Sequence, residues 1–331
     1  MRLQAEADEL RAIVEGFAGR RIAVVGDVVV DEYLYGHTDR ISREAPVLIV
    51  RHESTSRFLG GAANAAANVA SLGGRCLALG VIGDDEAGRA LEGLCDEAGI
   101  DARFTVVPGS HTETKTRILA GGINTTRQQM LRVDRSRGAS LPDAASADLV
   151  ARLRTAAAEA DVVIVSDYGS GVLGPEAIEE VRRLAADGVK ICVDSRYNLP
   201  AFRGVLVAKP NEPELGAATG LSVGTAEASV EAGLALQRAL DCHAVLATRG
   251  RSGMTLIEKG LAPEHIPVHG NDEAVDVTGA GDTVVATLAL AIAAGASLSQ
   301  AARIANVAGA LVVRRMGTVA LGPTELLGEL S

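Results

Sequence analysis

The chain lacks tryptophan and has only four phenylalanines and four tyrosines among its 331 residues. Aromatic rings therefore contribute little to the interior, although 47% of the residues are hydrophobic. The core has to be built from small aliphatic side chains, which favours close packing of helices against a sheet. Because α/β folds often reach this length as one unit, we expect a single domain over residues 1–331.

Cysteine pairs are also missing. Cys76, Cys95, Cys192 and Cys242 are far apart in the sequence, and no two of them form a CxxC motif. Three of them lie in or near apolar runs that are typical of strands. We expect reduced cysteines in the interior of a cytoplasmic protein.

Neither long apolar segments nor an excess of basic residues is present. The apolar runs are shorter than the roughly 20 residues that span a bilayer, and the first ten residues contain acids but no signal-peptide core. The formal net charge of −10 opposes binding to nucleic acids and to anionic membrane surfaces. We therefore expect a cytoplasmic protein with no nucleic-acid or membrane partner.

Apolar strand patterns alternate with helix patterns along most of the chain. Strands are predicted at residues 21–27, 76–83, 161–167, 189–194 and 243–250, and helices at 4–18, 85–98, 175–187 and over most of the chain after 279. This alternation predicts an α/β fold with a doubly wound, mostly parallel sheet flanked by helices. Such sheets bind ligands beyond the carboxyl ends of their strands, where Asp27, Asp167, Asp194 and Arg249 stand.

Two segments interrupt the alternation. Residues 33–58 and 112–134 are predicted to form extra β-strands, the second with a hairpin signal at Gly121-Gly122-Ile123-Asn124. We expect a small β lid, which would exclude water and so favour group transfer over hydrolysis. A hairpin that serves only as a dimer surface is the alternative. Both roles can coexist, and exposed strand edges in the lid suggest a homodimer.

The segment DVTGAGDT, residues 276–283, leads directly into an apolar helix. Gly279 and Gly281 allow a sharp turn that aims several N–H groups at one point, where the helix dipole adds its field. This pattern predicts an anion site. Asp282 inside it would repel a bound phosphate, so it is better explained as a base that deprotonates an attacking hydroxyl. The alternative is an ordinary turn capped by Thr278 or Asp282.

Residues 59–74 contain a second candidate site. Asn64 and Asn68 follow a glycine pair and lie four residues apart, hence on one face of a predicted helix, where they could hold sugar hydroxyls. The alternative is a pair of surface amides. Asp27 and Asp31 flank three valines, which is costly unless each carboxylate meets a hydroxyl, an N–H group or a cation. Asp31 is the more plausible ligand contact of the two.

Two further patterns allow two interpretations each. Asn211 and Glu214 have the spacing of a helix capping box, and Glu214 could alternatively lie near a water-coordinated Mg²⁺. GSGVLG at 169–174, with Asp194 about 20 residues later, fits a dinucleotide site and so a nicotinamide-dependent dehydrogenase. That interpretation leaves DVTGAGDT without a purpose. No GxxxxGK[ST] motif occurs, which excludes a P-loop.

Basic residues gather in the predicted lid, although the whole chain is acidic. They are Lys115, Arg117, Arg127, Arg132, Arg135 and Arg137. The alternative is a solvated hairpin face. The local reversal of charge nonetheless suits a phosphorylated substrate, and we expect Lys115, Arg117 and Arg132 to contact its phosphate.

Three of these segments occur together in an order that resembles one family. GGAANAAANVASLGG (60–74), KPNEPE (209–214) and DVTGAGDT (276–283) are similar to the N-terminal signature, the NxxE element and the C-terminal signature of the ribokinase-like, or PfkB, carbohydrate kinases. The resemblance covers nearly the whole chain. It implies a ribokinase-like fold and a sugar kinase that uses ATP and Mg²⁺.

The resemblance also implies site residues. The base would be Asp282, with Gly279, Ala280 and Gly281 as the anion hole. The sugar would contact Asp31, Gly61 and Asn64. Asn211 and Glu214 would organise Mg²⁺ and the phosphates, with Glu214 acting on the metal through water. The adenine side would involve Thr248, Gly250, Gly253, Asn306 and Gly309.

Within the family, RQQMLRVD (127–134), ISREAPV (41–47) and SDYGSGVL (166–173) are similar to D-glycero-D-manno-heptose 7-phosphate kinases. Those enzymes make the 1,7-bisphosphate on the route to ADP-heptose and lipopolysaccharide. Ser170 stands where they usually have lysine, and Asp194-Ser195-Arg196 replaces a DPK-like segment. Some carry a second, nucleotidyltransferase domain with an HxGH motif. Since that motif is absent here, the resemblance implies a kinase-only form.

Three other functions stay open at this stage. The first is another kinase of the same fold that acts on fructose phosphate, ribose or a nucleoside. The second is the dehydrogenase, and the third is an inactive sugar-binding regulator on a kinase scaffold. The intact DVTGAGDT segment argues against the third.

Overall fold

The structure is a computed structural model that describes residues 2–122, 127–138, 140–270, 274–317 and 320–330, without the side chains of residues 2–4 and 39–40. Its main sheet has the strand order β15-β14-β13-β12-β11-β10-β1-β4-β6. The parallel strands are β1 (Arg21–Gly26), β4 (Arg75–Leu79), β6 (Asp101–Ala102), β10 (Val162–Asp167), β11 (Ile191–Ser195), β12 (Val207–Ala208) and β13 (Ala244–Thr248). Two antiparallel strands, β14 (Met254–Glu258) and β15 (Glu264–Ile266), complete it. The predicted doubly wound, mostly parallel sheet is confirmed.

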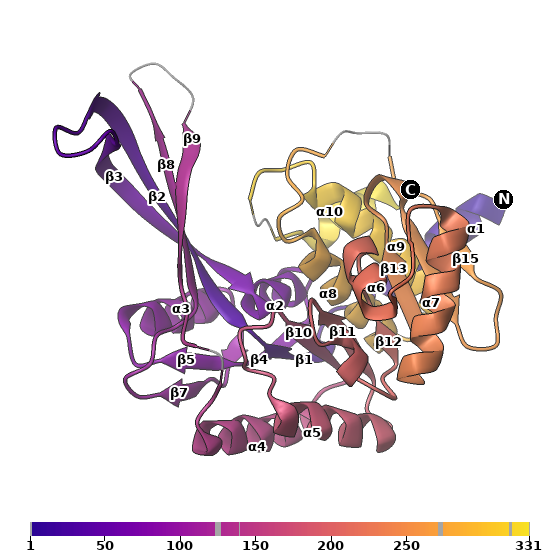
Figure 1. Cartoon of the computed structure of the whole chain (residues 1–331). Coiled ribbons are helices and arrows are strands. Elements are labelled where there is room, and N and C mark those ends of the chain that lie inside the picture. Colours follow the sequence, from indigo (N-terminus) through magenta and orange to yellow (C-terminus); the bar gives the residue numbers. More distant parts are fainter. Residues whose placement is uncertain (1, 123–126, 139, 271–273, 318–319, 331) are drawn as a thin grey trace.

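Helices cover both faces of this sheet (Figure 1). One core contains side chains of α1 (Arg2–Glu15), α2 (Ala62–Ser71), α3 (Glu86–Glu97), α8 (Ala280–Ala293), α9 (Leu298–Val312) and α10 (Pro323–Glu329). The other contains side chains of α4 (Asp143–Glu159), α5 (Pro175–Ala186), α6 (Glu212–Thr219) and α7 (Ala226–Leu240). Alternate residues of β1 enter the two cores, Ile22 and Val24 on one face and Ala23 and Val25 on the other.

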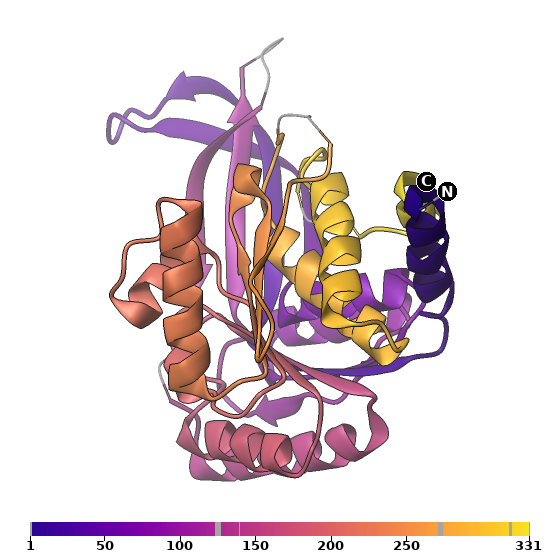
Figure 2. The same cartoon turned by 90° about the vertical axis from the view of Figure 1, so that its right-hand side faces the viewer.

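The interior consists mainly of small aliphatic side chains, as the composition predicts. Ile22, Leu149 and Ile164 are among the largest side chains that are fully buried, and Phe17 and Phe202 are the aromatic ones among them. All four cysteines are buried and free of disulfides. The helices α1 and α10 pack together, so the two ends of the described chain lie side by side (Figure 2).

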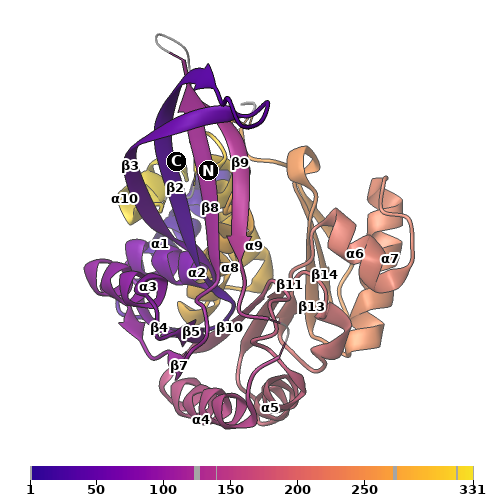
Figure 3. The same ribbon diagram turned by 60° about the vertical axis from the view of Figure 1, so that its left-hand side comes forward.

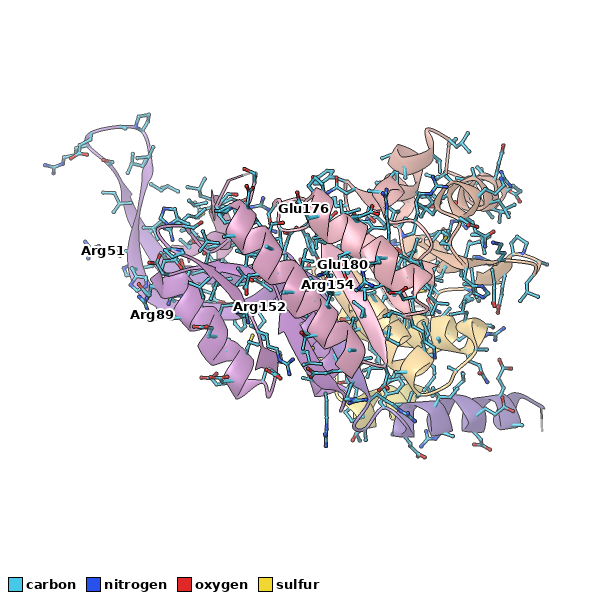
Figure 4. All side chains as sticks on the ribbon, turned by 90° about the horizontal axis from the view of Figure 1, so that it is seen from below. Arg51, Arg89, Arg152, Arg154, Glu176 and Glu180 are labelled. Atoms are coloured by element: carbon cyan, nitrogen blue, oxygen red, sulfur yellow. The ribbon has the colours of Figure 1, made fainter. Side chains whose placement is uncertain are left out.

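On the lower surface, α4 and α5 lie side by side (Figure 4). Glu180 of α5 is buried between two arginines, with distances of 2.8 Å to Arg154 of α4 and 2.6 Å to Arg183. The hydrogen bond from Arg154 is the largest influence that lowers the pKa of Glu180 to about 2. Within the described residues, no helix is long and apolar enough to cross a membrane.

The direction of winding reverses beside β1. The chain runs from β1 to β4 and β6 on one side, then returns to β10 on the other side and continues through β11, β12 and β13. Ligands bind such sheets in the crevice beyond the carboxyl ends of the strands at this reversal. Those ends are occupied by Asp27 after β1 and by Asp167 and Tyr168 at the end of β10.

The single strand that we predict at 76–83 is wrong. The chain leaves the main sheet after β4, and β5 (Val81–Gly83) pairs with β7 (Thr105–Val107) in a small separate sheet. The break falls at Gly80, where a Cβ atom would lie 2.8 Å from the side chain of Val28. An apolar run in the sequence gives no sign of this break, because both halves are buried.

A second sheet of four strands stands out from the main body (Figures 1 and 3). Its order is β3-β2-β8-β9, formed by β2 (Val28–Ile41), β3 (Leu48–Gly61), β8 (Thr114–Gly121) and β9 (Gln128–Arg135). We call these four strands the lid. The predicted hairpin is present, since β8 and β9 pair antiparallel, although Ile123 and Asn124 of its turn lie outside the described residues. The first lid strand begins at Val28, directly after β1, and is longer than predicted.

Candidate active site

The glycine turn before α8 has the geometry expected of an anion site. Gly279 is the N-cap residue and has a left-handed backbone with φ 78°, and no side chain caps the helix. The alternative, a cap made by Thr278 or Asp282, is therefore wrong. The backbone N–H groups of Gly279, Gly281 and Asp282 have no hydrogen-bond acceptor among the described residues. Three donors and the positive end of a helix dipole are thus available to an anion.

Asp282 lies in the first turn of α8 with only 3% of its surface exposed. Its Oδ2 accepts a hydrogen bond of 2.7 Å from Asn64 Nδ2, and its Oδ1 accepts one of 2.7 Å from the Tyr168 hydroxyl. Burial raises the pKa of Asp282 to about 6, although both hydrogen bonds lower it. A carboxylate with a pKa near neutral pH can accept a proton from a substrate, and its remaining lone pairs are free to do so.

The two asparagines of α2 lie on one helix face, as their spacing predicts, and both reach the start of α8. Asn68 Nδ2 donates to the Asn64 carbonyl oxygen at 2.9 Å, and Asn68 Oδ1 accepts from Thr283 Oγ1 at 2.8 Å. Asn64 therefore holds the Asp282 side chain while Asn68 holds Asn64. The interpretation as surface amides is wrong, because both side chains are buried.

Asp27 is fully buried at the end of β1. It meets the N–H groups and hydroxyl that such a carboxylate needs, since it accepts from Tyr168 N at 2.6 Å, Ser170 N at 3.2 Å and Ser170 Oγ at 2.5 Å. Gly61 lies directly against it, and a Cβ there would be 2.3 Å from the Asp27 carbonyl oxygen. Gly61 thus lets α2 begin next to the end of β1.

Asp31 is paired with a cation. Arg117 Nη1 of β8 donates to its Oδ1 at 2.5 Å, and both side chains are largely buried. A Cβ at Gly60 would be 2.4 Å from Asp31 Oδ2, so any larger residue there would displace this carboxylate. Arg117 thus neutralises the charge of Asp31, the residue proposed to contact the sugar, and its own charge is neutralised in turn.

The arginines of the lid, including Arg117 and Arg132 that we expect to contact phosphate, mostly have acidic partners. Arg132 donates to both oxygens of Asp134 at 2.7 Å on the exposed lid surface, and Arg127 pairs with Glu53 at 2.5 Å. Lys115 is different: its Nζ lies 5.4 Å from the centre of the Tyr168 ring, and no carboxylate pairs with it among the described residues. Lys115 is therefore a lid cation beside Tyr168 whose charge no carboxylate of the described residues neutralises.

Arg137, just after β9, is a second such cation. Its Nη2 donates to the Ser170 carbonyl oxygen at 3.2 Å, while Nε and Nη1 are buried without a hydrogen-bond partner in the described part of the chain. Burial lowers the pKa of this guanidinium. Buried N–H groups without acceptors are costly, which suggests that a ligand supplies an acceptor here.

The sequence analysis misses two residues of the site. Tyr168 lies in SDYGSGVL, a segment that we noted only for its resemblance to heptose 7-phosphate kinases, yet its hydroxyl touches Asp282. Lys209, just before Pro210, is buried and its Nζ lies 3.0 Å from Asp194 Oδ2. Burial lowers the pKa of Lys209, but Asp194 together with Glu214 and Asp282 outweighs it and the pKa is raised, so the lysine is charged. A lysine inside KPNEPE next to a strand end was the available signal.

Asn211 and Glu214 form the capping box of α6, as one of the two interpretations predicts. Each side chain accepts from the backbone N–H of the other at 2.9 Å. Burial raises the pKa of Glu214, and Asp194 raises it further. No cluster of three or more metal-binding side chains occurs in the described residues. A single carboxylate, that of Glu214, at the start of α6 fits a Mg²⁺ ion held mainly by phosphates and water.

The residues predicted for the adenine side fall into two groups. Thr248 bridges to Asn211 at the end of β13, and Gly250 and Gly253 follow in a turn with φ 51° and 77°. Asn306 and Gly309 lie on α9, where Asn306 Nδ2 donates to the Pro267 carbonyl oxygen at 2.7 Å. A Cβ on Gly309 would be 2.9 Å from Val284 Cγ2, so this glycine lets α8 and α9 pack closely.

Sequence comparisons find similar proteins over nearly the whole chain. Residues 20–325 match the family model described as "pfkB family carbohydrate kinase". The chain is 44% identical over 323 residues to "Bifunctional protein HldE" of Caulobacter vibrioides and 40% identical over 319 residues to that of Edwardsiella ictaluri, covering 96% of this chain in each case. It spans 65% of the length of these relatives.

Solved structures show the same fold at low identity. A ribokinase of Arabidopsis thaliana complexed with ribose and ATP is 21% identical, with a TM-score of 0.72 over 95% of this chain and 99% of that one. The phosphofructokinase-2 of Escherichia coli in complex with substrates and products is 17% identical, with a TM-score of 0.74 over 95% and 98%.

Proposed function

Because the chain belongs to the pfkB family of carbohydrate kinases, we propose that Asp282 is its general base. The backbone amides of Gly279, Gly281 and Asp282 would bind the phosphoryl group during its transfer. The buried carboxylate at the start of α8, beside three unused N–H groups, is the observation that carries this proposal. The nucleotide would be ATP with Mg²⁺ bound to its phosphates near Glu214.

The reaction follows from the chemistry of these groups. The sugar hydroxyl transfers its proton to Asp282 as its oxygen attacks the γ-phosphorus, and the bond from that phosphorus to the bridging oxygen of ADP breaks. The amides of the turn and the charge of Lys209 stabilise the negative charge on the transferred group. Asp31, Gly61 and Asn64 remain the proposed sugar side, with the adenine side on Thr248, Gly250, Gly253 and α9.

We propose a phosphorylated sugar as the acceptor, most specifically D-glycero-D-manno-heptose 7-phosphate, which would become the 1,7-bisphosphate. The motifs in the lid and around Tyr168 resemble kinases of that substrate. Lys115 and Arg137, which have no carboxylate partners among the described side chains, supply positive charge for the second phosphate. The dehydrogenase alternative is weakened, because its acid, Asp194, is paired with Lys209.

We also propose that the protein forms a homodimer through the lid and acts in the cytoplasm. The lid strand β9 exposes Leu131 and Val133 at 56% and 45% of their surface. A second copy would cover them. Light scattering on the wild-type chain and on a Leu131→Glu, Val133→Glu variant tests this, and a wild-type monomer would contradict it.

Turnover assays test the main proposal. Asp282→Asn should lose at least about a thousandfold in kcat while keeping its fold and its affinity for ATP. Asp96→Asn is the matched control, since Asp96 is an exposed aspartate on α3, far along the chain from the glycine turn. An Asp282→Asn variant that kept most of its kcat would show that the base lies elsewhere.

A substrate panel tests the acceptor. ADP release should be measured with heptose 7-phosphate, fructose 6-phosphate, fructose 1-phosphate, ribose and adenosine. We expect the highest kcat/KM with heptose 7-phosphate. Faster turnover of an unphosphorylated sugar would exclude this acceptor while leaving the kinase assignment in place.

A further inference from the structure

Tyr168 stands out because it touches the proposed base and belongs to none of the three family segments. Its hydroxyl donates to Asp282 Oδ1 at 2.7 Å, from the connection between β10 and α5. The contact joins residues 114 positions apart in the sequence. On the other oxygen, Asn64 donates at the same distance, so the carboxylate is held from two sides.

The backbone around Tyr168 is fixed by two buried carboxylates. Asp27 accepts from the N–H groups of Tyr168 and Ser170, and Asp167 Oδ1 accepts from Gly169 N at 3.0 Å. Asp167 Oδ2 is held in turn by Ser195 Oγ at 2.6 Å. Three successive residues are therefore anchored on β1, β10 and β11, which leaves the tyrosine little freedom to move.

Two cations hold the ring itself. Lys115 Nζ of the lid lies 5.4 Å from the ring centre, and the guanidinium carbon of Arg196 lies 5.6 Å from it. Both distances allow a cation–π contact. Burial raises the pKa of Tyr168 well above its usual range, and Asp282 raises it further. The hydroxyl therefore stays protonated and acts as a donor at every pH where the enzyme works.

We propose that Tyr168 is a positioning residue that orients the Asp282 carboxylate and keeps it ionised near neutral pH. The inference rests on the proposed function of Asp282 as the base. Burial alone favours the protonated carboxyl, which cannot accept a proton. A hydrogen bond to the ionised form opposes this effect, and it also points the unused lone pair of Oδ1 in one fixed direction.

The other charged groups that face Asp282 do not remove the need for this bond. Asp194 of β11 favours the protonated form, while Lys209 favours the ionised form and is already paired with Asp194. Asn64 of α2 donates only to Oδ2. Among the described residues, Tyr168 is thus the donor that controls Oδ1.

The pH dependence of kcat/KM for the sugar tests this role, because a merely structural tyrosine would not move it. In Tyr168→Phe, the acid limb should shift from about pH 6 upward by about one unit. We expect kcat/KM at pH 6 to fall about fivefold, because the ionised fraction of Asp282 falls from about one half to about one tenth, and to recover largely at pH 8.5, with the KM for ATP unchanged. Tyr35→Phe, on the lid away from Asp282, is the matched control and should keep the wild-type profile.

A second variant keeps the shape of the side chain and should shift the acid limb in the opposite direction. Fluorotyrosine at position 168 is a stronger donor, so the acid limb should move to lower pH. An acid limb at the wild-type pH in both variants would overturn the inference. If Asp282→Asn were inactive at the same time, the proposed base would stand and only the role of Tyr168 would fail.

Discussion

Lys209 Nζ lies 3.0 Å from Asp194 Oδ2, and the pair sits directly under the glycine turn of α8. A Cβ atom on Gly281 would be 3.5 Å from the lysine nitrogen and 3.6 Å from the aspartate oxygen. These are ordinary contact distances. The Cα of Gly281 therefore faces a buried ion pair across a space about one methyl group wide, next to the free amides.

A substitution at Gly281 should therefore affect catalysis without impairing folding. We expect Gly281→Ala to fold at least as well as the wild type, because its backbone is helical and alanine favours a helix by about 0.5–1 kcal/mol. The added methyl group would occupy the space between Lys209 and the amides. Turnover should fall about a hundredfold or more. Thermal unfolding and steady-state kinetics on the same preparation would check both effects.

Gly279→Ala is the contrasting variant. Its left-handed φ of 78° should cost about 1–2 kcal/mol of stability for an alanine. A Gly281→Ala variant with full activity would contradict the anion-hole assignment, whatever Gly279→Ala does.

The raised pKa of Asp282 makes a prediction about stability. Between the unfolded value of 3.8 and the folded value of about 6, the folded protein binds a proton that the unfolded chain has released. Stability is therefore lost as the pH rises through this window, and the ionised carboxylate costs on the order of 1–3 kcal/mol above it. Asp282→Asn should be more stable than the wild type at pH 7.5, and the difference should vanish near pH 4.

Chemical denaturation at several pH values would measure this difference in the free energy of unfolding. Asp96→Asn again serves as the control. A variant that is less stable than the wild type at pH 7.5 would show that the carboxylate is not penalised by its burial.

The sequence predicts the architecture well where a physical pattern is local. Strands buried on both faces are continuous apolar runs, so β1 and β10 were predicted within one residue of their bounds. The break at Gly80 was missed, because it depends on the contact of that glycine with Val28 from a distant part of the fold.

The same distinction applies to the candidate site. The spacing of Gly279 and Asp282 before an apolar helix predicts their roles from the sequence. Tyr168 has no such spacing, and Lys209 is marked only by its place in KPNEPE beside a strand end. Only the folded sheet brings the ends of β10, β11 and β12 next to the start of α8. The pairing of Arg117 with Asp31 was likewise invisible, because it depends on the parallel register of β2 and β8.

The lid cations should differ in their effect on the substrate. Lys115→Ala should raise the KM for a phosphorylated sugar about tenfold, because a cation without a carboxylate partner is lost. Arg132→Ala should stay within about twofold, since that guanidinium is exposed and paired with Asp134. Kinetics with a phosphorylated and an unphosphorylated sugar would check this. Equal effects of the two variants would contradict the assignment of Lys115.

Gly309 allows a test of whether a family position acts through packing. A Cβ there would be 2.9 Å from Val284 Cγ2, so Gly309→Ala should overpack the contact between α8 and α9 and cost about 1 kcal/mol or more. Because α8 carries the anion hole and Asp282, the overpacking should also lower kcat. Val284→Ala removes the clashing methyl group, and the double variant should regain most of both losses. Unfolding and kinetics of the two single variants and the double variant give the coupling energy. If the double variant stays as impaired in ATP affinity as Gly309→Ala, the glycine acts on the nucleotide directly and not through α8.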